Sequence, residues 1–365
     1  MRYIGLHTPY IFYNYVLGWF QEGAASFRQS VRALQDQSGI DESLTLLLAL
    51  HGALESEVSD FGSAITALQR ALDLAERGAH DREAAFCLAK LGRVQFYQGV
   101  YEQARRYASK VLNLAQQSNL QSESAQALLV LGMVAVGEAN HHEAIEHLEN
   151  ALTIYRLLDH YLDTAFALNR LGVTLLILKQ HDEARKRFEN SLEIYRTMYI
   201  QHGISAVLCN LGLLDWKFGN YADARKEFEQ SLVMELDVGD PWGIANCHAN
   251  LGHLGCTAGR FAEALSHYYE ALPIARDLKA DALVLEVISG MAAPIARHNG
   301  EIDRAITILE FSLHHPATDG WTQRDGEKLF RQLKAVVPSE RVVVAEEDGK
   351  SFELESVIKT LLKNT

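Results

Sequence analysis

Two asparagines that stand forty residues apart could bind the backbone of a peptide. Asn210 and Asn250 each immediately precede a Leu-Gly pair. A side-chain amide offers both a hydrogen-bond donor and an acceptor, so it matches a peptide unit whatever the sequence of the bound chain. The competing interpretation is that both amides only cap or cross-link neighbouring helices. The sequence leaves the two interpretations open.

Basic residues at related positions could bind an anion. Arg170 precedes another Leu-Gly pair, and Lys90 and Arg93 flank a third. Guanidinium and ammonium groups in these places favour a carboxylate or phosphate partner. The chain also contains 47 Asp and Glu residues, so salt bridges within the protein are the competing explanation for these cations.

The histidine-rich stretch His141–His147 resembles a zinc-protease motif but does not match one. The HExxH motif would need histidine where Glu146 stands, and HxxEH would need it where Glu143 stands. No Ser-His-Asp or Cys-His arrangement can be argued from spacing either. We therefore expect no catalytic residues and a protein that is not an enzyme.

The four cysteines show neither a disulfide pattern nor a metal-binding one. They are Cys87, Cys209, Cys247 and Cys256, and none belongs to a CxxC pair. Cys247 and Cys256, with His248 or His253 between them, are nine residues apart, which places the two sulfur atoms too far apart on one helix for a zinc cluster. We expect reduced, mostly buried thiols, no metal and no cofactor. An enzyme or metal protein remains the remote alternative.

The net charge narrows the range of partners. It is −13 at pH 7, and the sequence pI is near 5.6. An acidic surface repels phosphate backbones and anionic lipid, which argues against direct binding to nucleic acid or membrane. No apolar run of membrane-spanning length and no signal peptide is evident. We expect a cytoplasmic protein.

A forty-residue period organises all of these residues. One marker is a Leu-Gly pair, and the second is an alanine that keeps the same step. The pairs are Leu91-Gly92, Leu131-Gly132, Leu171-Gly172, Leu211-Gly212 and Leu251-Gly252, and the alanines are Ala24, Ala64, Ala104, Ala144, Ala184, Ala224 and Ala264. A fixed step over most of a chain is typical of a solenoid, in which stacked units share one continuous core.

Each unit should be a helix, a short turn and a second helix. In residues 165–200, apolar residues recur at helical spacing on both sides of a break at residues 179–182. The Gly and Ala markers are small so that the two helices can approach, with a large residue such as Phe188 beside them. Gly99, Gly219 and Gly259 should form left-handed turns. Asp240-Pro241 should begin a helix, and Asp41, Asp81 and Asp281, at about the same position of their repeats, should cap helices too.

The expected architecture is an all-α, right-handed superhelix of about eight hairpins plus a helical C-terminal cap. The repeat array should cover residues 1–320 and the cap residues 321–365. The predicted units run over 5–40, 45–80, 85–120, 125–160, 165–200, 205–240, 245–280 and 283–315. In the cap we expect helices over 322–336 and 353–363, with a turn over 346–350. The aromatic residues of the first twenty positions either seal the first hairpin or once faced an upstream domain.

The pattern resembles the tetratricopeptide repeat over about residues 5–315. In three units an aromatic residue follows the marker alanine by four (Phe188, Phe228 and Tyr268), and in five units a small residue follows that alanine by seven. These small residues are Ala71, Ala151, Ser191, Ser231 and Ala271. The step is longer than the usual thirty-four, as in adaptors of the Pins/LGN type and in the C-terminal sensor regions of bacterial STAND, LuxR and SARP-type regulators. The stretch from Trp321 to Ile358 resembles the end of such regulators.

The resemblance implies that the first helices line a concave groove that holds a peptide or protein. In the Pins/LGN-type family, asparagine before Leu-Gly holds an extended peptide. The residues expected in the groove are Lys90, Arg93, Phe96, Tyr97, Asn169, Arg170, Ile177, Asn210, Trp216, Asn246, Asn250 and His253.

The resemblance further implies a non-catalytic sensor or scaffold, part of a bacterial signalling or transcriptional regulator. An upstream nucleotide-binding switch domain would be its possible partner, because no GxxxxGK[ST] loop occurs in this sequence. A free-standing adaptor that bridges two proteins is the alternative.

Overall fold

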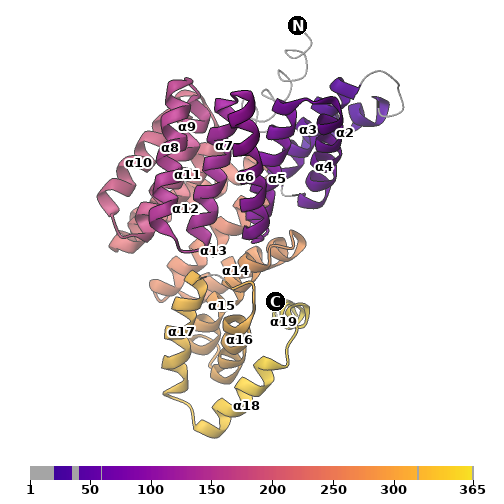
Figure 1. Ribbon diagram of the computed structural model, residues 1–365. Helices are drawn as coiled ribbons and strands as arrows, with labels where there is room; N and C mark the ends of the chain where they lie inside the picture. Colours follow the sequence, from indigo (N-terminus) through magenta and orange to yellow (C-terminus); the bar gives the residue numbers. More distant parts are fainter. Residues whose placement is uncertain (1–19, 35–40, 59, 319, 364–365) are drawn as a thin grey trace. The chain divides into compact units, whose positions relative to one another are not determined.

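The computed structural model describes residues 20–34, 41–58, 60–318 and 320–363, and every regular element in these ranges is an α-helix (Figure 1). The expected all-α solenoid is confirmed. The helices are α2 (Phe20–Leu34), α3 (Asp41–Glu57), α4 (Phe61–Gly78), α5 (Asp81–Tyr97), α6 (Tyr101–Ser118), α7 (Gln121–Gly137), α8 (His141–Leu157), α9 (Tyr161–Ile177), α10 (His181–Thr197), α11 (Gln201–Phe218), α12 (Tyr221–Val238), α13 (Pro241–Thr257), α14 (Phe261–Asp277), α15 (Asp281–Arg297), α16 (Ile302–His314), α17 (Gly320–Lys334), α18 (Ser339–Lys350) and α19 (Leu354–Leu362).

From α3 to α16 the helices form hairpins at the forty-residue step. We call the first helix of each hairpin its A helix and the second its B helix, so that α5 and α9 are A helices and α6 and α10 are B helices. Each A helix begins about four residues before the start expected from the apolar pattern, because polar first turns such as Asp81–Glu83 are helical too. The expected unit of 5–40 is described only over α2.

The steric role of the Leu-Gly glycine is confirmed. A Cβ atom at Gly172 would lie 2.5 Å from the Phe188 ring, and one at Gly252 would lie 2.5 Å from the Tyr268 ring. Both rings are completely buried. Any side chain at these glycines would therefore force the two helices of the hairpin apart, which explains why the period shows up in the sequence as glycine beside a large residue.

The turns repeat at half the period. A left-handed residue ends one helix after another, every twenty residues from position 79 to position 279 and then at 300. The expected glycines Gly99, Gly219 and Gly259 are among them, with φ of 75°, 82° and 72°. Other positions are occupied by Ala79, Asn119, Ala139, Asp159, Lys179, Tyr199, Gly239, Lys279 and Gly300. Non-glycine residues accept this strain because the turn satisfies the last carbonyls of each helix.

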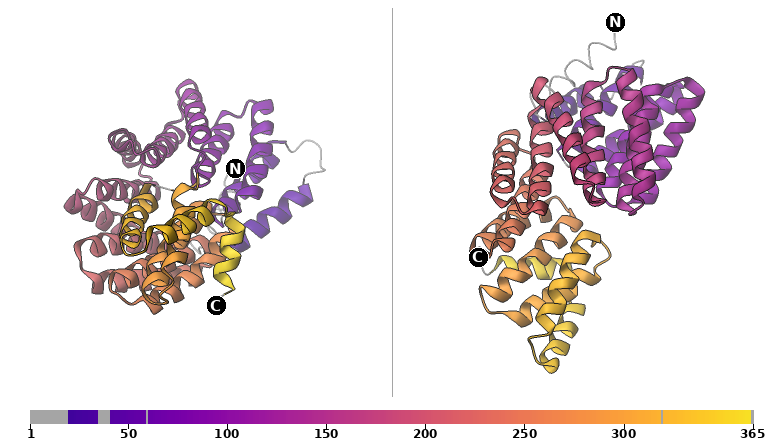
Figure 2. Two further views of the ribbon diagram at one scale, coloured as in Figure 1. Left: turned by 90° about the horizontal axis from the view of Figure 1, so that it is seen from below. Right: turned by 90° about the vertical axis from the view of Figure 1, so that its left-hand side faces the viewer.

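The chain divides into two compact units, Met1–Leu214 and Asp215–Thr365, with the division inside α11. Within the first unit the hairpins stack side by side (Figure 2). Its A helices touch one another directly, α3 with α5, α5 with α7 and α7 with α9. Its B helices are linked instead by long side chains, such as Arg105 of α6 to Glu143 of α8. The A helices are therefore the more closely packed layer, on the inner side of the curve.

The C-terminal helices pack on the last hairpin, within the second unit. Helix α17 contacts α15 and α16, and α18 contacts α16. The turn expected over residues 346–350 is wrong, because α18 continues to Lys350. A Cβ atom at Gly349 would lie 2.7 Å from the carbonyl oxygen of Thr307, so this glycine lets α18 lie close against α16 inside a helix rather than ending one.

The helix starts confirm one capping prediction and correct three others. The carboxylate of Asp240 accepts the backbone N–H groups of Trp242 and Gly243, with Pro241 at the first helical position. Asp41, Asp81 and Asp281 are instead the first residues of their helices, where a carboxylate interacts favourably with the positive end of the helix dipole without capping it. The aromatic residues before Phe20 lie outside the described residues.

Candidate functional site

Two A helices of the first unit carry matching stripes of polar and aromatic side chains. In α5 the stripe occupies positions 90, 93 and 97, and in α9 it occupies positions 163, 166 and 170. Residues three and seven apart share one side of a helix. We call these residues the A-helix face. It consists of Lys90, Arg93, Tyr97, Asp163, Phe166 and Arg170.

The two stripes meet across the intervening helix α7. The Arg170 guanidinium donates a long hydrogen bond of 3.4 Å to the Tyr97 hydroxyl, over a sequence separation of 73 residues. The same guanidinium lies 4.8 Å from the centre of the Phe166 ring. Tyr97 in turn stacks on Phe61, with ring centres 6.2 Å apart. Tyr97 is 37 % exposed, so this junction is open to solvent.

The charged residues of the A-helix face differ in how closely an opposite charge lies beside them. Arg93 forms an ion pair with Glu57 at the end of α3. Burial would raise the pKa of Glu57, but Arg93, Lys90 and His202 together hold it below its usual value. Burial, reinforced by the neighbouring Arg93, lowers the pKa of Lys90 to about 8, although Glu57 and Asp163 act in the opposite direction.

Lys90 and Arg170 occupy the same place in two different repeats, immediately before Leu-Gly. The residue at this place in α7 between them is Val130, which is buried. Met133, the α7 counterpart of Arg93, is buried as well. Helix α7 thus has buried apolar residues at the two positions where α5 has Lys90 and Arg93.

Asn210 supports the cross-linking interpretation in one respect. Its amide donates a 2.8 Å hydrogen bond to the side-chain oxygen of Asn169, which is buried, and thereby joins α11 to α9. This bond uses the side-chain nitrogen of Asn210 and not its side-chain oxygen. In the second unit Asn250 is buried and Asn246 half-buried.

Two other residues expected in the groove differ in how far they reach solvent. Phe96 is partly buried and contacts Tyr97 edge to face. Ile177 is 40 % exposed.

The expected groove residues of the second unit are tied into a polar network. The hydroxyl oxygen of Tyr268 lies 2.8 Å from Nδ1 of His253, and Nε2 of His253 lies 3.1 Å from a carboxylate oxygen of Glu286, both at hydrogen-bond distance. The Trp216 ring stacks on His253, with its indole N–H on the Thr257 hydroxyl at 3.0 Å. This arrangement fixes the imidazole from several sides, so His253 and Trp216 contribute to the packing of α11, α13 and α15 in this unit.

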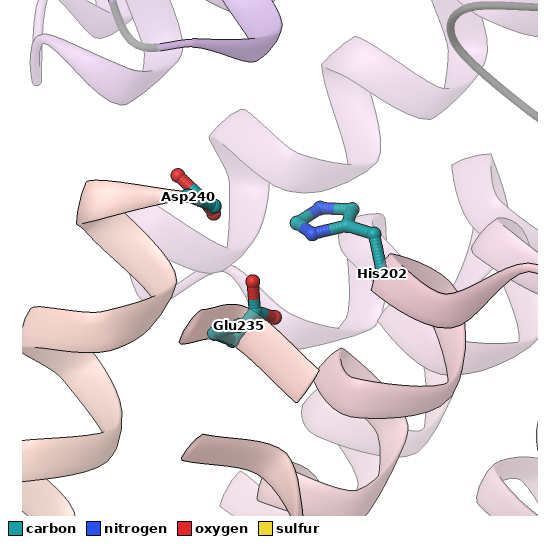
Figure 3. A group of neighbouring side chains, drawn as sticks. All are labelled: His202, Glu235 and Asp240. Atoms are coloured by element: carbon teal, nitrogen blue, oxygen red, sulfur yellow. The ribbon is translucent and has the colours of Figure 1, made fainter. Parts of the chain in front are cut away.

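The turn between α12 and α13 also gathers acidic side chains (Figure 3). A Cβ atom at Gly243 would lie 2.5 Å from the carboxyl carbon of Glu235, so the glycine makes room for this buried acid. Figure 3 draws Glu235 and Asp240 together with His202 of the first unit. All three are of metal-ligating types. Both oxygens of Asp240 already accept backbone amides, however, and we assign no metal site to them.

The cysteines are free thiols, as expected, and three of them are buried. Burial raises the pKa of Cys87 to about 12 and that of Cys256 to about 11. Both thiols are therefore protonated at neutral pH and unsuited to nucleophilic chemistry.

Comparison with known proteins identifies the repeat. Residues 123–197 and 201–277 match the sequence model of the tetratricopeptide repeat family. No curated protein matches the chain. Among solved structures, a Rap protein complexed with Competence and Sporulation Factor is similar, with a TM-score of 0.64 and 14 % identity over 100 % of this chain and 99 % of that one. The Cut9–Hcn1 hetero-tetramer of the APC/C gives a TM-score of 0.57 and 18 % identity, over 86 % of this chain and 52 % of that one.

These similarities establish a tetratricopeptide-type helical solenoid. At such low identity they speak for the fold alone. In the described part of the chain no helix is both long and apolar enough to cross a membrane.

Three residues in or beside the site were not expected from the sequence. Asp163, Phe166 and Glu57 contribute to the A-helix face or its charge balance but were not expected there. A signal was present for two of them, since Asp163 and Phe166 precede Arg170 by seven and four residues, on the same side of α9.

Proposed function

We propose that the protein is a cytoplasmic, non-catalytic scaffold that binds a peptide, or an extended segment of a protein, along the A-helix face. The observation that carries the proposal is the junction of Tyr97 and Arg170. It is partly exposed and joins two helices that are two repeats apart. Aromatic and cationic groups are the types that dominate recognition of peptides.

The similar solenoids support the proposal. The Rap protein was solved with Competence and Sporulation Factor, and Cut9 with Hcn1. In both, a fold of this type holds a partner. By analogy we place the partner of this chain on the closely packed inner layer, where side chains from several repeats converge.

We further propose that the chain is the sensor part of a bacterial signalling or transcriptional regulator. A nucleotide-binding switch domain would then be a further partner. The resemblance of the stretch from Trp321 to Ile358 supports it. A free-standing adaptor is the second candidate, favoured by a second exposed surface on α18, where Val343 and Val344 are 51 % and 58 % exposed. Native mass spectrometry of complexes isolated from the source cells separates the two. A switch-domain protein supports the regulator, and two different partners bound at once support the adaptor.

The direct test of peptide binding is selection from a random octapeptide library by the immobilised full chain. Tyr97→Ala removes the aromatic centre of the junction. Tyr161→Ala is the matched control, because Tyr161 is 59 % exposed in the same helix as Arg170 but two residues from Asp163, on the other side of α9. Circular dichroism confirms that each variant keeps its helices.

We expect the wild-type chain to enrich a set of peptides, Tyr97→Ala to lose them, and Tyr161→Ala to keep them. A wild-type chain that enriches nothing over a blank surface would overturn the proposal. If Tyr97→Ala enriches the same peptides equally well, the peptides bind somewhere other than the A-helix face.

A further inference from the structure

One hairpin of the second unit differs from the other repeats at a position of the core. His248 lies in α13, three residues before Leu251-Gly252. The residue at the same place of the A helices α3, α5, α7, α9, α11 and α15 is apolar in every case: Leu48, Leu88, Leu128, Leu168, Leu208 and Ile288. Burying part of a polar imidazole among packed helices costs free energy that a leucine would not. The solenoid itself therefore does not require a histidine at this place.

The imidazole of His248 faces a second imidazole from the next helix. Its Nδ1 atom lies 3.1 Å from Nδ1 of His267 in α14, and the two ring centres are 5.3 Å apart. Both residues are half-buried, so solvent can reach the pair. They are 19 positions apart in the sequence and lie on two helices, which is why no metal-binding motif was evident there.

The separation of the two nitrogen atoms is that of two ligands on one metal ion. Imidazole nitrogen binds zinc at about 2.0–2.1 Å, and two such bonds at about 95–100° to each other place their nitrogen atoms about 3.1 Å apart. Angles of this size lie between those of octahedral and tetrahedral coordination. A hydrogen bond from one imidazole to the other is the competing use of the same atoms. The two uses exclude each other, because a metal ion takes the lone pairs of both nitrogen atoms.

A carboxylate lies next to the pair. Glu270 is exposed and follows His267 by three residues, on the same side of α14. Burial lowers the pKa of both imidazoles, and Glu270 acts in the opposite direction on each, so its carboxylate lies near both rings. Glu263, one turn before His267, is instead held by ion pairs with Arg225 and Arg260. Glu270 is therefore the carboxylate that can turn towards the pair.

We propose that His248 and His267 bind one divalent transition-metal ion through their Nδ1 atoms, with Glu270 as a third ligand. Imidazole donors suit zinc, copper and nickel, whereas magnesium and calcium prefer oxygen ligands alone. An ion held by α13 and α14 would cross-link the two helices of one hairpin and thereby stabilise the folded chain. The inference does not depend on peptide binding to the A-helix face.

Titration calorimetry of the metal-stripped full chain with Zn²⁺ tests the proposal. His248→Leu removes one ligand and introduces the residue that five other repeats have at this place, so the variant should fold. His267→Gln removes the other imidazole, and Glu270→Gln removes the carboxylate at nearly constant size. The matched control is His142→Gln/His298→Gln, which removes two exposed histidines from other helices. Circular dichroism of the metal-free chains checks that each variant keeps its helices.

We expect one tightly bound Zn²⁺ per chain in the wild type and in the control, and no competition from an equal concentration of Mg²⁺. Loss of a residue that only orients a metal ligand costs about 10- to 100-fold in metal affinity, so His248→Leu and His267→Gln should each bind Zn²⁺ at least about a hundredfold more weakly. Glu270→Gln should lie between these variants and the wild type. Zn²⁺ should raise the urea midpoint of the wild type and not that of His248→Leu.

Undiminished Zn²⁺ binding by His248→Leu or His267→Gln would overturn the inference, because other side chains would then hold the ion. A wild-type chain that binds no Zn²⁺ would overturn it as well and would leave the two imidazoles joined by a hydrogen bond alone. Equal affinity in Glu270→Gln and the wild type would overturn the part assigned to that carboxylate.

Discussion

Two cations on the A helices of the first unit, Lys90 and Arg170, differ in their surroundings from the arginines of its B helices. On the B helices, each arginine that links hairpins reaches a carboxylate of its neighbour, as Arg105 does to Glu138 and Glu143 and Arg187 does to Glu149. On the A helices, Lys90 and Arg170 have rings beside them instead. The difference teaches that an arginine of either layer can join neighbouring repeats, as Arg93 of α5 also does with Glu57, whereas Lys90 and Arg170 pack against rings.

The largest expected effect comes from reversing one inner charge. Arg170→Glu should weaken binding of an acidic octapeptide from the random library by more than a hundredfold, because a carboxylate beside the ligand repels it where a guanidinium attracted it. The same variant should begin to enrich peptides that contain Lys or Arg. Titration calorimetry measures the first effect and library selection the second. Arg187→Glu, with the same change on a B helix, should leave both unchanged; equal losses for the two variants would mean that net charge alone governs binding.

A pH titration should give the next largest effect. The pKa of Lys90 is about 8 in the free protein, with Arg93, Glu57 and Asp163 as the charged groups around it. A bound carboxylate favours the charged ammonium and raises this pKa, so binding takes up a proton above pH 8. Affinity for an acidic octapeptide should therefore be highest below pH 8 and fall about tenfold by pH 9.5. Lys90→Met should show no such fall, and a decline that persists in Lys90→Met would assign it to another group.

The smallest effect is on stability, and its sign differs between the layers. Lys90→Met removes a buried cation whose pKa is lowered by that burial, and should raise the free energy of unfolding by up to about 1 kcal/mol. Arg105→Met removes two half-exposed ion pairs and should lower it by about 0.5 kcal/mol. Urea unfolding monitored by circular dichroism measures both. If both variants destabilise the chain equally, the inner cations serve the fold as the outer ones do.

The hairpins could be predicted from sequence because their cause is local and repeated. Gly172 must be small for Phe188 to fit, and the same constraint returns at Gly252 with Tyr268. The left-handed turns were predictable only at glycines. Asp159 and Tyr199 adopt the same conformation because the turn closes the hairpin, a requirement their side chains do not show.

The candidate site was only partly predictable, because it depends on how tightly the repeats curve. The forty-residue period alone placed Lys90, Arg170 and Asn210 on one side of the A helices, because each immediately precedes a Leu-Gly pair. It did not show that Asn210 would pair with Asn169, or that Arg170 would reach Tyr97 two repeats away. Helix α18 was missed for a related reason, since the β-branched run from Val342 favours an extended chain until packing on α16 holds it in a helix.

Photo-crosslinking tests the central claim most directly, because it locates the bound peptide. The full chain carries the photoreactive amino acid benzoylphenylalanine in place of Tyr97, or in place of Tyr161 as the control. It is irradiated with an octapeptide that the wild-type chain selected from the random library. If the peptide binds on the A-helix face, a crosslink should form from position 97 and should be lost when Lys90 and Arg170 are also changed to methionine. No crosslink should form from position 161. A crosslink from position 161 but not from position 97 would contradict it.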